Sequence, residues 1–366
     1  MIFKQFDPTD IVAGRSQPVS TGMWSDGETK WSLFFTSSVQ TIPSSSQFEP
    51  LNGLYYTNVY DYPVASASAD IYFSITYGHN AGSGSSTFDT NSSQGSLLYP
   101  TKAIYNQYRN LLLSPGDSKF SFIQSDSFGN QTSIDVDSIY AIAFRSTKFK
   151  DRLDPGQFEI TLSGSLGTIT LIDDSRDNPD TGLQTGGKRY NLIQGSIAAG
   201  AAQTRNYQAI GSIYPDLGIV ILNPYKLTQL IGSVNGYSLS DPINDWSGQF
   251  ARMSNLLFES IKNGAKLANK EMKARVTEFV PARHYFVRVK NQEYNYSNNP
   301  TFIISDSTSQ DFGKLRFTDF YTDPKVYITT VGLYNESNDL VAVAKLSQPL
   351  LKDFTNECLI KIKIDI

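Results

Sequence analysis

The feature that most constrains this chain is the strict alternation of apolar and charged residues in its last segment. Residues 360–366 read Ile-Lys-Ile-Lys-Ile-Asp-Ile. A period of two places successive side chains on opposite faces of a strand, so that one face is buried and the other faces water. The sequence therefore predicts that this segment is a strand paired into a sheet and not a disordered tail.

A β-hairpin is predicted immediately before this strand. Residues 326–334 and residues 340–347 are rich in β-branched and aromatic side chains, and the five polar residues 335–339 separate them. Two such runs around a short polar segment are typical of a hairpin with a five-residue loop.

Four stretches of the chain resemble a known class of proteins. They read YITTVGLYN at 327–335, LVAVAKLSQP at 340–349, EYNYSNNP at 293–300 and RSTKFKDRLDPG at 145–156. These stretches resemble segments of virion proteins from contractile-tailed bacteriophages of the cyanobacterial myovirus type, in particular baseplate wedge proteins. The resemblance implies a virion structural protein of the tail baseplate, assembled in the cytoplasm of the bacterial host.

The resemblance also implies how such a protein works. A wedge subunit acts through protein–protein assembly, so we expect no enzyme activity, no catalytic residues, no cofactor and no metal. Its partners would be other phage tail and baseplate proteins, and the chain could also form a homo-oligomer. We expect it to bind neither nucleic acid nor a membrane. The residues expected to form the partner interface are Tyr285, Phe286, Arg288, Tyr294, Tyr296, Tyr327, Tyr334 and Lys345.

Two alternatives remain open at this point. One is a tail-associated host-recognition protein that binds or degrades carbohydrate, because paired carboxylates of a glycosidase meet only in the fold. The other is a neck or head-completion protein.

Composition agrees with a β-rich assembly protein. Aromatic residues make up 13% of the chain and charged residues only 18%, below the roughly 25% of ordinary soluble domains. Tyrosine suits surfaces that are partly buried against partners. The net charge of −4 disfavours general nucleic-acid binding.

The single cysteine, Cys358, excludes an intramolecular disulfide, and we expect it to be a small buried apolar residue. The first residues lack the pattern of a secretory signal, and no apolar run is long enough to span a membrane.

The fold is expected to be mainly β. Strand-like runs separated by turn residues predict an N-terminal sandwich or barrel-like body. They lie at 11–13, 31–35, 54–56, 70–77, 120–123, 138–144, 158–162, 168–172, 190–197 and 219–222. A short helix is predicted at 101–113 and a helical turn at 224–231. The polar loops 79–96 and 173–188 are long, and we expect them to become ordered against a neighbour.

One long helix is predicted at about 245–276. Trp246, Phe250, Met253, Leu257 and Ile261 recur at spacings of three and four, which places them on one stripe. Gly264 is expected to weaken the helix in its middle. The cations of the second half are expected to form a solvated face, with docking against an acidic partner as the alternative; they are Lys266, Lys270, Lys273 and Arg275.

A domain boundary is predicted in the stretch rich in Gly, Ser, Asn and Pro at 232–244. It divides the chain into an N-terminal body, residues 1–240, and a second part, residues 241–366. In this second part the long helix links the body to a C-terminal β module ending in the hairpin and the terminal strand.

Candidate reactive groups are few. His79 lies in a loop rich in Gly and Ser and is expected to face solvent, whereas His284 lies on a strand. Alternation places His284 on one strand face with Phe286, Arg288 and Lys290, which favours a partner-facing side, with a grip on a nucleic-acid strand as the alternative.

Two acidic stretches, 173–180 and 135–137, raise the alternative of a calcium site, although their spacing does not match an EF-hand loop. Residues 185–189 lack the Ser or Thr that follows the lysine of a phosphate-binding loop.

Overall fold

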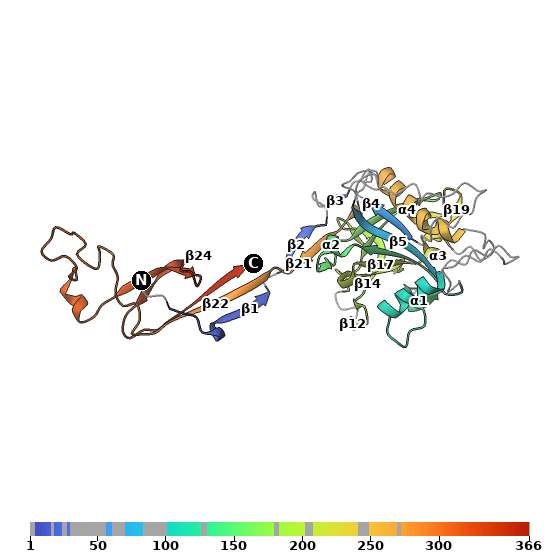
Figure 1. Ribbon diagram of the computed structural model, residues 1–366. Helices are drawn as coiled ribbons and strands as arrows, with labels where there is room; N and C mark the ends of the chain where they lie inside the picture. Colours follow the sequence, from blue (N-terminus) through green and yellow to red (C-terminus); the bar gives the residue numbers. More distant parts are fainter. Residues whose placement is uncertain are drawn as a thin grey trace. The chain divides into compact units, whose positions relative to one another are not determined.

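The structure is a computed structural model that divides the chain into two compact units (Figure 1). Unit 1 combines Met1–Gln17 with Phe279–Ile366, and unit 2 is Pro18–Glu278. The structure describes residues 4–15, 18–23, 28–29, 56–60, 70–82, 101–125, 130–178, 183–201, 208–240, 249–268 and 272–365.

Unit 2 is built around one 11-stranded sheet that curls into a half-barrel. Among the described residues all its strand pairings are antiparallel, and the strand order is β3-β20-β10-β11-β14-β16-β17-β8-β5-β4, with β15 paired to β14. The strands are β3 (Glu28–Thr29), β4 (Tyr56–Tyr60), β5 (Ile71–His79), β8 (Ser138–Phe144), β10 (Glu159–Gly164), β11 (Gly167–Asp173), β14 (Tyr190–Ser196), β15 (Gly200–Ala201), β16 (Gly211–Tyr214), β17 (Ile219–Leu222) and β20 (Met272–Lys273).

Helix α4 (Gln249–Ala268) packs against one face of this sheet. It contacts β10 near one edge and also β4 and β5 at the other, which requires the sheet to curl around it. Its buried Met253, Leu257 and Ile261 lie in the larger hydrophobic core. The helix approaches β10 closely because Gly264 has no side chain: a Cβ there would lie 2.5 Å from the carbonyl oxygen of Thr161.

Ser260, on α4, completes the hydrogen bonding of β10. Its buried Oγ donates to the carbonyl oxygen of Ser163 at 2.9 Å and accepts from the Ser163 N–H at 3.2 Å. Buried backbone groups need partners. The helix therefore supplies the hydrogen-bond donor and acceptor for the backbone of Ser163 that a neighbouring strand would otherwise supply.

A second core lies on the opposite face of the sheet. Ile139 and Ala141 of β8 point into it, whereas Tyr140 and Ile142 point into the first core. Helix α1 (Thr101–Leu112) and the hairpin of β6 (Phe120–Ser125) and β7 (Gln131–Val136) cover this face. In Figure 1 α1 and α4 accordingly lie on opposite sides of the sheet.

Short elements complete unit 2. Helix α3 (Pro224–Ile231) begins after Asn223, whose Oδ1 accepts hydrogen bonds from the N–H groups of Tyr225 and Lys226. A three-stranded sheet joins β2 (Val19–Gly22), β21 (Arg275–Glu278) and β9 (Arg152–Leu153). The remaining elements are α2 (Ser146–Phe149), β12 (Leu183–Gln184), β13 (Gly187–Lys188), η4 (Pro215–Leu217), β18 (Ser233–Val234) and β19 (Tyr237–Ser238).

Unit 1 is assembled from two distant parts of the sequence. Strand β22 (Pro281–Val289) lies between β1 (Ile11–Arg15) and β25 (Cys358–Asp365) in an antiparallel sheet. Strands β23 (Val326–Tyr334) and β24 (Leu340–Lys352) form a hairpin whose inner side chains share a small core with this sheet. The 3-10 helices η1 (Pro8–Asp10) and η5 (Thr318–Tyr321) also belong to unit 1.

The mainly β character is confirmed, as are the terminal strand and the hairpin with its five-residue loop. Helices were predicted correctly at 101–113 and 224–231. The strand candidate at 31–35 and most of the loop at 79–96 lie outside the described residues. Within the loop predicted at 173–188, the structure forms the small β12–β13 hairpin.

Other expectations need correction. The long helix does not reach residue 276, since it ends at Ala268 and Lys273 and Arg275 lie on strands β20 and β21. It packs within unit 2 and is not a linker. The division into units also differs from the predicted boundary near residue 240, because β1 pairs with β22.

His79 does not face solvent as expected. It ends β5, is buried, and its Nδ1 accepts a hydrogen bond from the N–H of Ala81 at 3.0 Å.

Candidate interaction surface

Among the described residues, unit 1 exposes more large apolar side chains than unit 2. Fifteen of the twenty-one exposed large apolar side chains belong to it, although it holds only a little more than a third of the described residues. Its own core cluster is small, with Leu333, Ile360 and Ile362 buried at the centre. Exposed apolar side chains that cluster mark sites of interaction. A binding surface is therefore expected in unit 1.

All eight residues predicted for the partner interface lie in unit 1, but the structure does not bring them onto one face. Tyr285 is half-buried and its ring lies 5.6 Å from that of Phe6, so it contributes to the core of the unit. Phe286 is also half-buried, with the Lys361 ammonium 5.8 Å above its ring. The other six are exposed: Arg288, Tyr294, Tyr296, Tyr327, Tyr334 and Lys345.

The most coherent apolar surface lies on the outer face of the hairpin. Tyr334 is paired with Leu340 and Gly332 with Val343. A Cβ on Gly332 would lie within 3.2 Å of both the Tyr334 ring and the Leu340 side chain, so these two side chains meet above the glycine. We call Tyr334, Leu340, Val341 and Val343 the hairpin patch; their exposed fractions are 40%, 53%, 67% and 57%.

Sequence reasoning missed three of these four residues, although a signal was present. Residues 340–344 read Leu-Val-Ala-Val-Ala without alternation. Ala342 and Ala344 contribute to the core of unit 1, so Val341 and Val343 are left for the outside. A strand that is apolar on both faces is typical of one that is covered on both faces.

Charged residues border the hairpin patch at both ends. Glu336 and Asp339 lie in the loop at the tip of the hairpin, and Lys345 lies opposite Thr330 further down the strand. None of the three has an ion pair among the described residues. Asp339 instead accepts from the Asn335 side chain at 3.1 Å, which orders the loop. The surface is therefore apolar in the middle, acidic at the tip and basic at the other end.

A second group of exposed rings lies on the segment between β22 and β23, residues 290–325, which we call the aromatic loop. Its only buried ring is Phe302, which stacks on Phe320 at 4.8 Å and meets Tyr296 edge to face at 5.6 Å. The loop is held by internal bonds such as that from Arg316 Nε to the Pro300 carbonyl oxygen, at 2.7 Å. Its exposed rings are Tyr294, Tyr296, Phe312, Phe317 and Tyr321.

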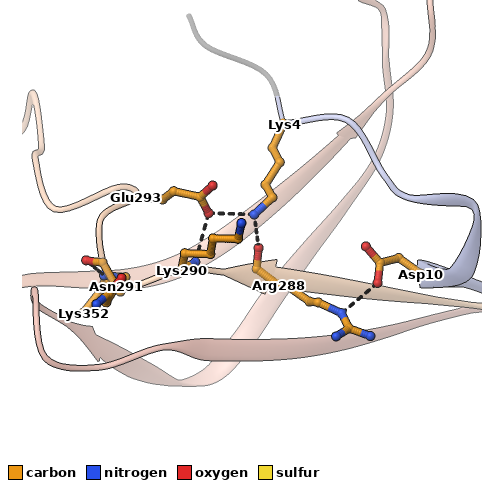
Figure 2. Close-up of polar contacts among 7 residues, drawn as sticks. All are labelled: Lys4, Asp10, Arg288, Lys290, Asn291, Glu293 and Lys352. Atoms are coloured by element: carbon orange, nitrogen blue, oxygen red, sulfur yellow. Dashed lines mark hydrogen bonds and ion pairs between the residues drawn. The ribbon is translucent and has the colours of Figure 1, made fainter.

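Ion pairs attach the N-terminal segment to β22 and to the aromatic loop (Figure 2). Lys4 Nζ donates to the Glu293 carboxylate at 2.6 Å, and Arg288 Nε donates to Asp10 Oδ1 at 2.8 Å. The Lys4 ammonium and the backbone N–H of Lys290 both lower the pKa of Glu293. Arg288, predicted as an interface residue, is thus engaged within the unit, although most of its side chain stays exposed.

A fully buried lysine anchors the aromatic loop to the end of the hairpin. Lys352 Nζ donates to the carbonyl oxygens of Asn291 at 2.8 Å and of Asp353 at 2.7 Å, and to Asn295 Oδ1 at 2.7 Å. The three N–H groups of the ammonium thus have three oxygen acceptors, none of them a carboxylate. Figure 2 shows Lys352 beside Asn291.

The alternatives at other residues gain no geometric support. The face carrying His284, Phe286 and Arg288 also carries Lys361 and Lys363, but Asp10 pairs with Arg288 and Asp365 with Lys363. In unit 2 the buried Asp173 and Asp174 accept hydrogen bonds from backbone N–H groups, for example those of Gly156 and Asn191, at 2.7 Å in both cases.

Among the described residues, no group of three or more His, Cys, Asp and Glu side chains is arranged to hold a metal ion.

An open cavity of about 360 Å³ is lined by Arg109, Asn110, Asp117 and Thr185 of unit 2, among others. Cys358 is buried, as expected. In the part of the chain that the structure describes, no helix combines the length and apolarity needed to cross a membrane.

Comparison with models of protein families, with characterised proteins and with solved structures finds no match for this chain.

Proposed function

We propose that this protein is a non-enzymatic structural component of a contractile phage tail, a baseplate wedge subunit that acts through protein–protein contacts. The observation that carries the proposal is the unequal distribution of apolar surface between the two units. Among the described residues, unit 2 buries most of its large apolar side chains in two cores, whereas unit 1 has a small core and exposes the hairpin patch and the aromatic loop. An assembly subunit combines a self-sufficient body with a unit whose apolar surface is covered by neighbours.

The phage assignment itself is supported by the sequence segments quoted above. Three of these four segments, residues 293–300, 327–335 and 340–349, lie in unit 1. The segments that carry the resemblance thus coincide largely with the unit that exposes apolar surface. We further propose that the partners are other tail and baseplate proteins, and that the protein is located in the virion after assembly in the host cytoplasm.

The test is to locate the protein in particles. An antibody raised against the purified chain is used to probe purified contractile-tailed particles, which are then treated with a lysine-reactive cross-linker and analysed by mass spectrometry. We expect the chain in intact particles, with cross-links from Lys345 and Lys361 of unit 1 to other tail proteins. Its absence from particles, with all of the protein free in the lysate, would refute the proposal.

A second candidate is carbohydrate recognition on the host surface, favoured by the exposed rings of the aromatic loop. Aromatic faces suit stacking against sugars, and the loop holds its rings in fixed positions through Phe302. A glycan array probed with the purified chain and with a Tyr296→Ala/Tyr321→Ala variant distinguishes the two. Binding by the first protein and not by the second would favour this candidate, and no binding by either would remove it.

A further inference from the structure

We infer that the hairpin patch is a self-association site, at which two copies of this chain pack their hairpins face to face about a two-fold axis. The inference concerns Tyr334, Leu340, Val341 and Val343 and the charges beside them. It does not rest on the proposed role in a phage tail, because it follows from the surface of unit 1 alone.

The size of the patch fits the core of a dimer interface. Taking about 150 to 230 Å² for the whole surface of each of these residue types, the exposed fractions leave on the order of 400 Å² of apolar surface. A standard interface buries about 800 Å² per partner, of which about 60% is apolar, or roughly 480 Å². The patch alone supplies most of this requirement, and Thr330 and Lys345 provide a polar rim.

The chemistry of the patch favours a second copy over a partner of opposite charge. Its four members carry no charge, so two copies can meet without bringing like charges together at the centre. An isologous contact requires a surface that is complementary to itself. An uncharged apolar sheet face of this kind packs on another sheet with a spacing of about 10 Å between the two sheets.

The charges at the two ends of the patch fix the orientation. With the two hairpins antiparallel, the acidic tip of one copy, Glu336 and Asp339, faces Lys345 of the other copy, and the two-fold axis produces this contact twice. The five residue steps from Leu340 to Lys345 span about 17 Å along the strand. A parallel arrangement would instead place acidic tip against acidic tip.

The test is sedimentation velocity of the full chain at about 1 to 100 µM, from which apparent dissociation constants are obtained. We expect a concentration-dependent dimer, and at least a 100-fold weaker association for Val343→Glu. Leu166→Glu is the matched control: Leu166 is 70% exposed in unit 2, and its replacement should leave association unchanged. Circular dichroism checks that both variants are folded.

Charge reversal tests the geometry. Lys345→Glu and Glu336→Lys should each weaken the dimer about tenfold, because each creates two repulsive pairs. The double variant Lys345→Glu/Glu336→Lys should bind more tightly than either single variant but less tightly than the wild type, since the pair between positions 336 and 345 is re-formed with opposite signs while Asp339 still repels the new glutamate.

A wild-type chain that stays monomeric up to 100 µM would overturn the inference, as would a dimer unaffected by Val343→Glu. A double variant no better than the single ones would overturn the antiparallel arrangement. A monomer in solution that still cross-links to tail proteins in particles would refute the inference while leaving the proposed function intact.

Discussion

Replacing the buried Lys352 by methionine tests most directly how unit 1 is held together. Methionine keeps the length of the side chain and removes the ammonium. Of the three acceptors that lose a donor, the Asn291 carbonyl oxygen keeps the hydrogen bond from Asn295 Nδ2, at 2.6 Å. Asn295 Oδ1 and the Asp353 carbonyl oxygen are left buried without the donor they have now.

The expected effect can be worked out from these contacts. A buried acceptor that loses its donor costs about 1 to 3 kcal/mol, so two of them cost about 2 to 6 kcal/mol. Burying a methionine in place of an ammonium returns on the order of 2 kcal/mol. The difference is about 0 to 4 kcal/mol, so we expect Lys352→Met to destabilise unit 1 by about 2 kcal/mol, the middle of this range.

Hydrogen exchange followed by mass spectrometry is the suitable assay because it reports on each unit separately. If exchange in unit 1 occurs through its unfolding, about 2 kcal/mol corresponds to roughly 30-fold faster exchange in peptides covering residues 291–295 and 350–356. Peptides from unit 2 should be unchanged. Lys290→Met, at an exposed lysine of the same unit, should alter stability by less than about 0.5 kcal/mol. Equal exchange rates for Lys352→Met and the wild type would show that these bonds do not stabilise the unit.

Three further predictions concern unit 2. Gly264→Ala should destabilise it by about 3 kcal/mol in urea unfolding, because the new Cβ would lie 2.5 Å from the Thr161 carbonyl oxygen; an increase in stability, as expected for an exposed helix position, would contradict the packing described. Asn223→Ala should cost about 1 kcal/mol by removing the cap of α3, and Asn223→Asp should retain most of it. Burial raises the pKa of Tyr105 to about 12, from 10 in the unfolded chain, so the neutral phenol stabilises the fold fully below pH 10. That contribution, about 2 kcal/mol, should be lost as the pH rises from 10 to 12, and Tyr105→Phe should lose less stability over this range in circular dichroism.

The elements that could be predicted from the sequence are those set by local pattern. Alternation in residues 360–366 sufficed for β25, and the polar residues 335–339 sufficed for the hairpin loop, because period and turn composition act within a few residues. The part of the α4 stripe formed by Met253, Leu257 and Ile261 was recognised for the same reason, whereas Trp246 lies outside the described residues.

What could not be predicted depends on contacts between distant residues. Gly264 was interpreted as a weak point of the helix, whereas it lies at the closest approach of α4 to β10. Nothing in the order of residues indicates that β1 pairs with β22, and so the division into units differed from the expected one. Six of the eight candidate interface residues are exposed, as expected. Val341 and Val343 were not predicted, because they point outward only as a result of Ala342 and Ala344 packing into the core of unit 1.

The pairing of β1 with β22 has a consequence for biosynthesis. Ile11 emerges from the ribosome long before its partner Tyr285, and the hairpin is synthesised later still. Unit 2 has its sheet strands and both cores within Pro18–Glu278, so it can fold while the rest of the chain is being translated. The hairpin is thus present only on polypeptides in which unit 2 has already been synthesised in full. A chain that stops before residue 340 lacks the hairpin patch and therefore cannot associate through it.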